Sequence, residues 1–164
     1  MASDNEKLHL VGFRVGKEHF AAPIANIQEI IRLTNIVTIP KSPMFIEGVI
    51  NLRGKVIPVI DLKKRFDMGA VEVSPTAKII VAEILKFHVG LIVDEVKEVV
   101  HSDMTNFEKT PSLVANVDQK FIKGLLKQDD KMMIVLDLEN VISDEEILML
   151  KNVAWGIWIK KISF

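Results

Sequence analysis

The feature that most constrains the fold of this chain is an internal repeat. Residues 45–62 align with residues 121–138 without a gap, at an offset of 76; seven of the eighteen positions are identical, and five more exchange one aliphatic side chain for another or for Met. A second block, residues 24–31, matches residues 93–100 at an offset of 69. A seven-residue difference in one loop reconciles the offsets, because loops tolerate such changes at small cost. The chain therefore contains two copies of one structural unit.

Each copy contains short runs of apolar and β-branched residues separated by turn residues, which is the pattern of β-strands. In the first copy the predicted elements are strands at residues 11–15 and 19–22 around a Gly16-Lys17 turn, a helical turn that begins at Ile24 and passes into a strand, strands at residues 48–52 and 55–60, and a short helix at residues 62–66. In the second copy, residues 79–85 and 89–93 flank a turn at residues 86–88. Short strands joined by turns favour a small closed barrel, because closure removes exposed strand edges.

One copy of about 65 residues would bury only a marginal core, so the two barrels are expected to pack on each other. The predicted fold is mainly β: two duplicated β-barrels related by an approximate two-fold axis, with short helices and a C-terminal helix. We expect the first barrel within residues 8–75 and the second within residues 76–142, with exchange of an N-terminal strand between them allowed. Residues 143–164 are expected to form the C-terminal helix and an apolar tail.

The end of the chain lies outside the repeat. Ser143 followed by Glu146 has the spacing of a capping box, which predicts the start of a helix. Residues 154–159 are unusually apolar and contain both tryptophans, Trp155 and Trp158. Three readings of this tail stay open: packing on a barrel, disorder, or contact with a partner. It is too short to span a membrane.

Composition narrows the function classes. Lys and Arg number 21 against 22 for Asp and Glu, so the sequence predicts no basic surface for nucleic acid. The absence of cysteine excludes disulfides and thiolate sites and fits a reducing compartment. The first seven residues are polar, unlike a secretory signal, and no apolar run approaches the roughly 18–20 residues of a membrane span. We therefore expect a cytoplasmic protein.

No enzyme motif is found in the sequence. It contains no glycine-rich phosphate loop and no metalloprotease or serine-hydrolase signature. Asp61 and Asp137 are equivalent in the two copies and each precedes a short helical pattern, so helix capping is favoured over a catalytic pair. The four histidines lack the spacing of metal ligands, and two of them occupy equivalent hairpin positions: His9, His19, His88 and His101. No cofactor is expected.

The two copies differ most at one turn, where residues 51–54 (Asn-Leu-Arg-Gly) face residues 127–130 (Lys-Gln-Asp-Asp). Both tetrapeptides suit a tight turn, so the barrel itself does not require Arg53. Arginine is frequent at interface hot spots, but an exposed solubilising turn residue is an equally acceptable reading. Glu29 is a candidate partner for Arg53, although its counterpart Glu98 in the second copy also allows a structural role.

Several segments of the sequence resemble a known family. Residues 48–62, from Gly48 to Leu62, are similar to the signature stretch of CheW, the bacterial chemotaxis coupling protein family, and shorter segments at residues 27–30, 38–40 and 93–96 resemble family segments. The resemblance covers residues 8–142. It implies two five-stranded SH3-like barrels, and a scaffold that joins chemoreceptor cytoplasmic tips to the regulatory domain of the histidine kinase CheA.

The resemblance also implies two sets of partner-binding residues. Arg53 and Glu29 would form the pair that matters for coupling, on a turn shaped by Asn51 and Gly54. The receptor tip would lie against an apolar groove between the barrels, and plain core packing is the alternative reading of the positions that resemble its lining: Val11, Ile27, Ile30 and Val96.

Two other functions stay open at the level of sequence. A CheW-like regulatory module of another signalling protein would share the fold, but the chain lacks receiver and kinase motifs. A small enzyme with an unrecognised site would need a pocket where histidines or carboxylates converge. The resemblance favours the adaptor, a cytoplasmic protein recruited to receptor arrays at the inner membrane.

Overall fold

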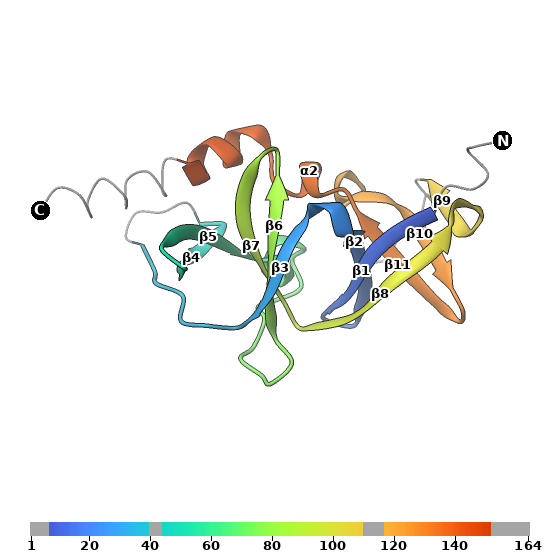
Figure 1. Cartoon of the computed structure of the whole chain (residues 1–164), viewed down its shortest axis with the longest axis horizontal. Coiled ribbons are helices and arrows are strands. Elements are labelled where there is room, and N and C mark those ends of the chain that lie inside the picture. Colours follow the sequence, from blue (N-terminus) through green and yellow to red (C-terminus); the bar gives the residue numbers. More distant parts are fainter. Residues whose placement is uncertain (1–6, 40–43, 110–116, 152–164) are drawn as a thin grey trace, which may run out of the picture.

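The computed structural model describes residues 7–39, 44–109 and 117–151, which form a mainly β structure (Figure 1). The strands are β1 (Lys7–Val15), β2 (Glu18–Pro23), β3 (Ile27–Arg32), β4 (Ile46–Leu52), β5 (Lys55–Asp61), β6 (Lys78–Ile84), β7 (Phe87–Val93), β8 (Glu95–Asp103), β9 (Phe107–Lys109), β10 (Ile122–Gln128) and β11 (Lys131–Leu136). The helices are α1 (Leu62–Arg65), α2 (Leu138–Val141), the 3₁₀ turns η2 (Ile24–Asn26), η3 (Met104–Asn106) and η4 (Gln119–Phe121), and a C-terminal helix at residues 144–151.

The strands form two sheets that each close into a barrel. In barrel 1 the strand order is β3-β6-β7-β5-β4, and the chain after β3 returns to β4 through paired backbone hydrogen bonds of 2.9 Å between Val37 and Val49. In barrel 2 the order is β8-β1-β2-β11-β10-β9, and β9, which follows β8 after the single turn η3, pairs with β10. Each barrel is closed in the same way: the chain segment that follows the first strand of the sheet pairs with the fifth strand, β4 in barrel 1 and β10 in barrel 2. Closure leaves few strand edges exposed.

The repeat explains why the two sheets have the same order. When β3 is replaced by its equivalent β8, β6 by β1, β7 by β2, β5 by β11 and β4 by β10, the order of barrel 1 becomes that of the first five strands of barrel 2, to which β9 is added. The predicted boundaries at residues 8–75 and 76–142 do not match this arrangement. Each copy contributes its first hairpin to the barrel of the other copy, through the parallel pairs β5–β7 and β2–β11. A whole hairpin therefore crosses in each direction, where the sequence allowed for one strand.

The local predictions agree with most of the structure. The helical turn at Ile24 is the 3₁₀ turn η2, which passes directly into β3. The second hairpin turns at Leu85 and Lys86, both with positive φ, one residue earlier than predicted, so that residues 87 and 88 belong to β7. The capping box is confirmed: Ser143 Oγ accepts from Glu146 N at 3.1 Å, and Glu146 Oε1 accepts from Ser143 N at 3.0 Å.

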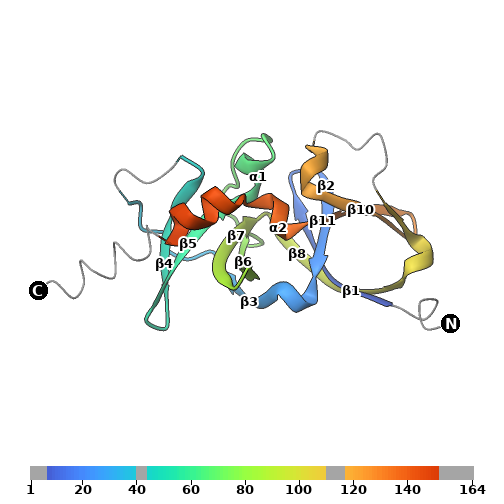
Figure 2. The same cartoon turned by 90° about the horizontal axis from the view of Figure 1, so that it is seen from above.

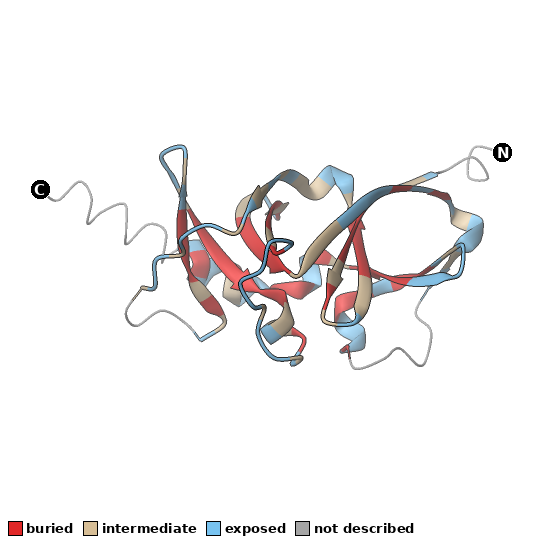
Figure 3. Ribbon diagram, turned by 90° about the horizontal axis from the view of Figure 1, so that it is seen from below, coloured by how far each residue is buried: buried red, intermediate tan, exposed pale blue. Residues whose placement is uncertain are grey.

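Three apolar clusters form the core. One draws only on strands of barrel 1, among them residues Ile50 and Ile79, and one only on strands of barrel 2, among them Leu10 and Leu126. The third cluster takes side chains from both barrels and from α1, η4, α2 and the C-terminal helix. We call the region where the two barrels share this third cluster the seam. Figure 3 shows buried residues along the strands of both barrels. This shared cluster is the largest of the three, so each barrel depends on the other for much of its burial in addition to its own smaller cluster.

The C-terminal helix is held near the seam by Arg65 of α1. Figure 2 shows this helix lying over barrel 1, with α2 leading into it. The Arg65 guanidinium makes a bidentate ion pair with Glu146, donates to the Val141 carbonyl at 3.0 Å, and lies 5.7 Å from the ring centroids of both Phe45 and Phe121. Because Phe45 and Phe121 are equivalent in the repeat, one arginine contacts both copies.

The two equivalent aspartates differ in role. Asp61 caps α1 as predicted: its buried carboxylate accepts from the backbone N–H groups of Lys63, Lys64 and Val71, at 2.8, 3.3 and 2.9 Å. Burial raises the pKa of Asp61 in spite of these three donors. For Asp137 the predicted capping bond is wrong, since its side chain accepts from Asn140 Nδ2 at 2.7 Å and from no backbone N–H of α2.

Candidate partner-binding site

The turn between β4 and β5 is shaped by the residues predicted for it. Arg53 and Gly54 both have positive φ, 51° and 87°, a region that glycine adopts freely and arginine rarely does. Gly54 N donates to Asn51 Oδ1 at 2.9 Å, an Asx-type bond that closes the turn. The turn therefore holds a non-glycine residue in the left-handed region, as the hairpin turns at Leu85, Lys86 and Asp129 also do, so the conformation comes from the hairpin.

Arg53 pairs with Glu29 of β3, as predicted. Arg53 Nη1 donates to Glu29 Oε2 at 3.3 Å, and Nη2 forms the second bond of a fork with Oε1. The Arg53 side chain is 72% exposed and that of Glu29 is 30% exposed. The hydrogen bond from Arg53 lowers the pKa of Glu29, and the bond to Glu29 raises the pKa of Arg53. The pair presents a preoriented cation to solvent.

The second copy shows that this arginine is not needed for the turn. Asp129 occupies the equivalent position of the β10–β11 turn with φ of 54°, almost the value of Arg53. The barrel therefore requires a left-handed residue at this place and leaves the choice of side chain open. Aspartate tolerates the left-handed region better than arginine, so Arg53 is not explained by backbone preference.

A small hollow adjoins the Arg53–Glu29 pair. Its volume is about 190 Å³, and its lining includes Gln28, Leu52 and His88. Drug-sized ligands and cofactors occupy pockets of roughly 300–1,000 Å³. The hollow has the dimensions for one side chain of a protein partner.

The predicted groove positions are exposed to different extents. Ile30 on β3 is 39% exposed, whereas Ile27 on β3 and Val96 on β8 are partly buried against the shared core. Val11 on β1 is only 4% exposed, so little of its side chain faces solvent. In Figure 1, β3 and β8, one strand from each barrel, lie on the near side of the molecule. The binding roles of these residues remain predictions.

One exposed apolar residue of this face was missed by sequence reasoning. Val99 on β8 is 49% exposed and is the repeat equivalent of Ile30. The alignment of residues 24–31 with residues 93–100 already pairs the two positions. An exposed β-branched residue at the same place in both copies is the signal that would have found it.

The described residues bring no set of ligands together for a metal. Across residues 7–39, 44–109 and 117–151, no group of three or more His, Asp or Glu side chains is placed to hold an ion. His9 and His101 do meet, with their Nδ1 atoms 2.7 Å apart on β1 and β8, a contact that sequence spacing did not reveal. His19 and His88 occupy equivalent hairpin positions, as predicted, opposite Arg14 and Glu83.

A larger hollow of about 720 Å³ lies between α1, η4 and the C-terminal helix. Its lining includes Phe45, Phe121 and Arg65, and the Arg65 guanidinium is already paired with Glu146. No histidine is among its described lining residues. Four carboxylates, Asp67, Asp118, Glu145 and Glu146, line the hollow together with Lys120, and of these carboxylates Glu146 is the one paired with Arg65.

Within the part of the chain that the structure describes, no helix has the length and apolar character needed to cross a membrane.

The chain is similar over most of its length to proteins of one known family. The family model of the CheW-like domain matches residues 9–146. The chain belongs to the CheW-like family. Among its CheW-like relatives, the probable chemotaxis protein CheW of Rhizobium etli is 36% identical over 139 residues, which cover 84% of this chain and 88% of that protein. The chemotaxis protein CheW of Thermotoga maritima is 34% identical over 156 residues, which cover 93% and 98%.

A solved CheW structure confirms the fold class. The scaffolding protein TtCheW from Thermoanaerobacter tengcongensis superposes with a TM-score of 0.78 at 41% sequence identity, covering 84% of this chain and 94% of that chain. The two closed barrels described above are therefore the SH3-like barrels of the CheW-like fold. The predicted function is confirmed at the level of the family: this CheW-like chain is a chemotaxis coupling adaptor, a member of a scaffold family.

Proposed function

We propose that this CheW-like protein joins the cytoplasmic tips of chemoreceptors to the regulatory domain of the histidine kinase CheA, in the cytoplasm at receptor arrays. The observation that carries the proposal is the exposed Arg53–Glu29 pair, which is present in one copy of the repeat and absent from the equivalent turn of the other. An arginine that the fold does not require, held by Glu29 and largely exposed to solvent, is well suited to recognise a partner carboxylate.

The apolar face of β3 and β8 supplies the second contact. Ile30 and Val99 are exposed, and Ile27 and Val96 are partly buried against the shared core; we expect the first two to form the rim and the last two the floor of the receptor-binding groove. An amphipathic helical hairpin fits such a face, because helices bind proteins by laying an apolar stripe into an apolar groove. The receptor tip is the proposed occupant of this groove, and the buried Val11 is proposed to support it from within barrel 2.

The proposed role is non-catalytic. The two aspartates that are equivalent in the repeat hold local structure, since Asp61 caps α1 and Asp137 accepts a hydrogen bond from Asn140. The protein would act by contributing interfaces whose strengths differ between the kinase-on and kinase-off states of the assembly. No phosphate transfer to this chain is involved.

The decisive experiment is a pair of binding titrations by calorimetry, one with a CheA regulatory domain and one with a receptor-tip fragment. We expect saturable binding to both, with no turnover. Arg53→Asp should keep the circular dichroism spectrum of the folded protein and weaken receptor binding about tenfold or more, as truncation of an interface arginine commonly does. Binding to neither partner by the wild-type protein would overturn the proposal.

Lys86→Asp is the matched control. Lys86 is also an exposed cation with positive φ on a hairpin turn of barrel 1, and its φ is 65°. The two substitutions change the net charge equally and place the same residue in the same kind of backbone. Equal loss of binding in both variants would assign the effect to general charge and remove Arg53 from the site.

A further inference from the structure

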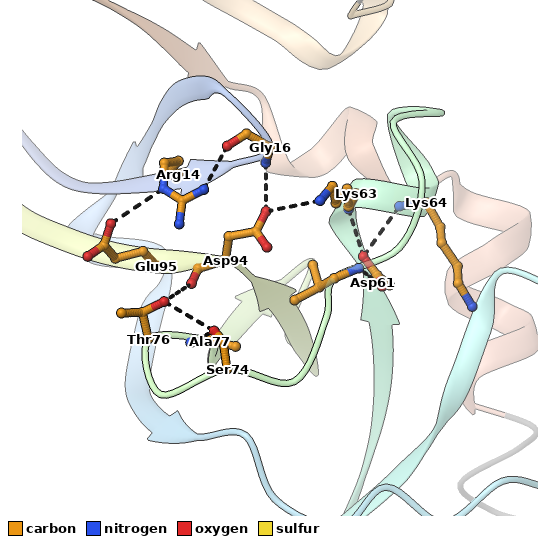
Figure 4. A network of polar contacts seen from close by, with 11 residues as sticks. Arg14, Gly16, Asp61, Lys63, Lys64, Ser74, Thr76, Ala77, Asp94 and Glu95 are labelled. Carbon is orange, nitrogen blue, oxygen red and sulfur yellow. Dashed lines mark hydrogen bonds and ion pairs between the residues drawn. The ribbon is translucent and has the colours of Figure 1, made fainter.

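Asp94 lies where the chain crosses from β7 of barrel 1 to β8 of barrel 2, and Figure 4 shows it at the centre of a polar network. Its Oδ2 atom accepts from Gly16 N at 2.6 Å, in the turn between β1 and β2. The same atom lies 3.8 Å from Lys63 Nζ of α1, in barrel 1. The Asp94 side chain is 13% exposed and that of Lys63 is 22% exposed, so both contacts are partly shielded from water.

The backbone of Asp94 is held as well. Asp94 N donates to the Arg14 carbonyl at 3.0 Å, and the Asp94 carbonyl accepts from Thr76 Oγ1 at 2.9 Å. Arg14 in turn donates to the Gly16 carbonyl at 2.8 Å. One residue therefore links the β1–β2 turn, α1 and the segment before β6, which come from both barrels (Figure 4).

The repeat provides an internal comparison for this link. In the alignment of residues 24–31 with residues 93–100, the equivalent of Asp94 is Ala25, and the equivalent of Gly16 is Leu85. At that second crossing the chain uses an amide, Asn26 Nδ2, which donates to the Glu83 carbonyl at 3.1 Å. The carboxylate link is thus present on one side of the molecule, and the fold is formed on the other side without one.

We propose that Asp94 is a positioning residue that sets the orientation of the two barrels and with it the spacing between β3 and β8. The inference rests on the proposed function, because those strands are the walls of the proposed receptor groove. Val96 follows Asp94 by two residues, and Val11 lies on the hairpin whose turn Asp94 holds, while Ile27 and Ile30 belong to the other barrel. Removing the carboxylate frees the β1–β2 turn from α1, and the two walls lose their fixed separation.

The chain offers a direct measurement, because it contains no cysteine. Lys55→Cys and Lys131→Cys place spin labels at equivalent, exposed positions, one in each barrel. The wild-type background should give one narrow distance distribution by double electron–electron resonance. Asp94→Ala should broaden or shift it, and Asp94→Asn should restore most of the narrow peak, because an amide oxygen still accepts from Gly16 N.

Glu95→Ala is the matched control. Glu95 is the neighbouring carboxylate, but its partners Arg14 and Lys97 both lie in barrel 2. It should leave the distance distribution unchanged. Should Asp94→Ala fail to fold, Lys63→Met removes only the cation and should give a smaller broadening of the same kind.

The binding readout separates positioning from simple stability. Asp94→Ala should weaken binding of the receptor-tip fragment about tenfold, the equivalent of one charge-assisted hydrogen bond. Binding of the CheA domain should change less than about twofold, and Asp94→Asn should recover most of the receptor affinity. A narrow, unchanged distance in Asp94→Ala, or equal loss of both affinities, would overturn the inference. If the wild-type protein binds neither partner, the proposed function fails, and the distance measurement still decides the role of Asp94.

Discussion

The β4–β5 turn of the first copy and the β10–β11 turn of the second share a left-handed backbone conformation at equivalent positions but present different side chains to solvent. Arg53 and Asp129 share a left-handed conformation, with φ of 51° and 54°, and the described contacts include an ion pair for Arg53, with Glu29 of β3, and none for Asp129. The fold explains what the two turns share, and it leaves unexplained what differs. A duplicated protein therefore contains an internal comparison: a side chain that differs between equivalent positions is not required by the fold that the two copies share.

The largest expected loss of stability comes from substituting the two equivalent glycines of the repeat, Gly48 and Gly124. A Cβ atom at Gly48 would lie 2.3 Å from the Val37 carbonyl oxygen, and one at Gly124 would lie 2.5 Å from the Glu108 carbonyl oxygen. Both contacts are with the strand that closes the barrel. We expect Gly48→Ala and Gly124→Ala each to lower the free energy of unfolding by about 3 kcal/mol, because neither backbone can withdraw without opening the closure.

Urea unfolding followed by far-ultraviolet circular dichroism measures this effect. Both variants should unfold in a single transition, since the barrels share a core. Gly69→Ala is the control: its Cβ meets no atom within 4 Å, so only the backbone strain of about 1 kcal/mol remains. Two separate transitions in either glycine variant would show that the barrels are independent.

The second prediction compares the equivalent aspartates. Asp61→Ala should cost about 2–3 kcal/mol, because three backbone N–H groups lose their buried acceptor. Asp137→Ala should cost less than about 1 kcal/mol, because its side chain accepts from one side-chain amide only. The same urea titration at pH 7 measures both. Equal losses would mean that Asp137 caps α2 in solution.

The third prediction concerns the ion pair between Arg65 of the first copy and Glu146 of the C-terminal helix. The position equivalent to Arg65 in the second copy is the apolar Val141. Partial burial raises the pKa of Glu146, but the bonds from Arg65 and from Ser143 N lower it further, and the net shift is downward. A lowered pKa in the folded state gives stability that is present above the ordinary glutamate value and is lost as the pH falls through the folded value.

Glu146→Gln should therefore destabilise the protein by about 1–2 kcal/mol at pH 7 and by much less at pH 3. The measurement is the gap in unfolding free energy between the wild type and the variant at the two pH values. Glu145→Gln, an exposed carboxylate one position earlier, serves as the control and should show little gap at either pH. A gap that is the same at pH 3 and pH 7 would contradict the role assigned to the ion pair.

The smallest expected effect sharpens the opening comparison. Exchanging the two turn residues, by Arg53→Asp or by Asp129→Arg, should leave the urea midpoint unchanged within experimental error, because both backbones are already left-handed and both side chains are exposed. Binding should respond in the Arg53 variant alone. A marked fall in the midpoint for Arg53→Asp would show that Glu29 needs its partner for folding.

Part of the candidate site could be predicted from sequence because it depends on short-range geometry. The turn at Asn51 to Gly54 is local, and its difference from the second copy is visible in an alignment. The Arg53–Glu29 pair was one of two open readings, and the structure shows the contact. The exposure of the groove positions could not be predicted, because Val11 and Ile30 are both aliphatic and only their neighbours decide that one is buried.

The sequence by itself determined the repeat, most hairpin positions and the capping box at Ser143, since each follows from the preferences of neighbouring residues. Only the tertiary structure decided which hairpin enters which barrel, the meeting of His9 with His101, and the links made by Arg65 and Asp94. The physical reason is that alternation of apolar residues reports which face of a strand is buried, but not which strand lies beside it. The parallel pairs β5–β7 and β2–β11 join segments distant in the chain, and their choice is made by the shared core.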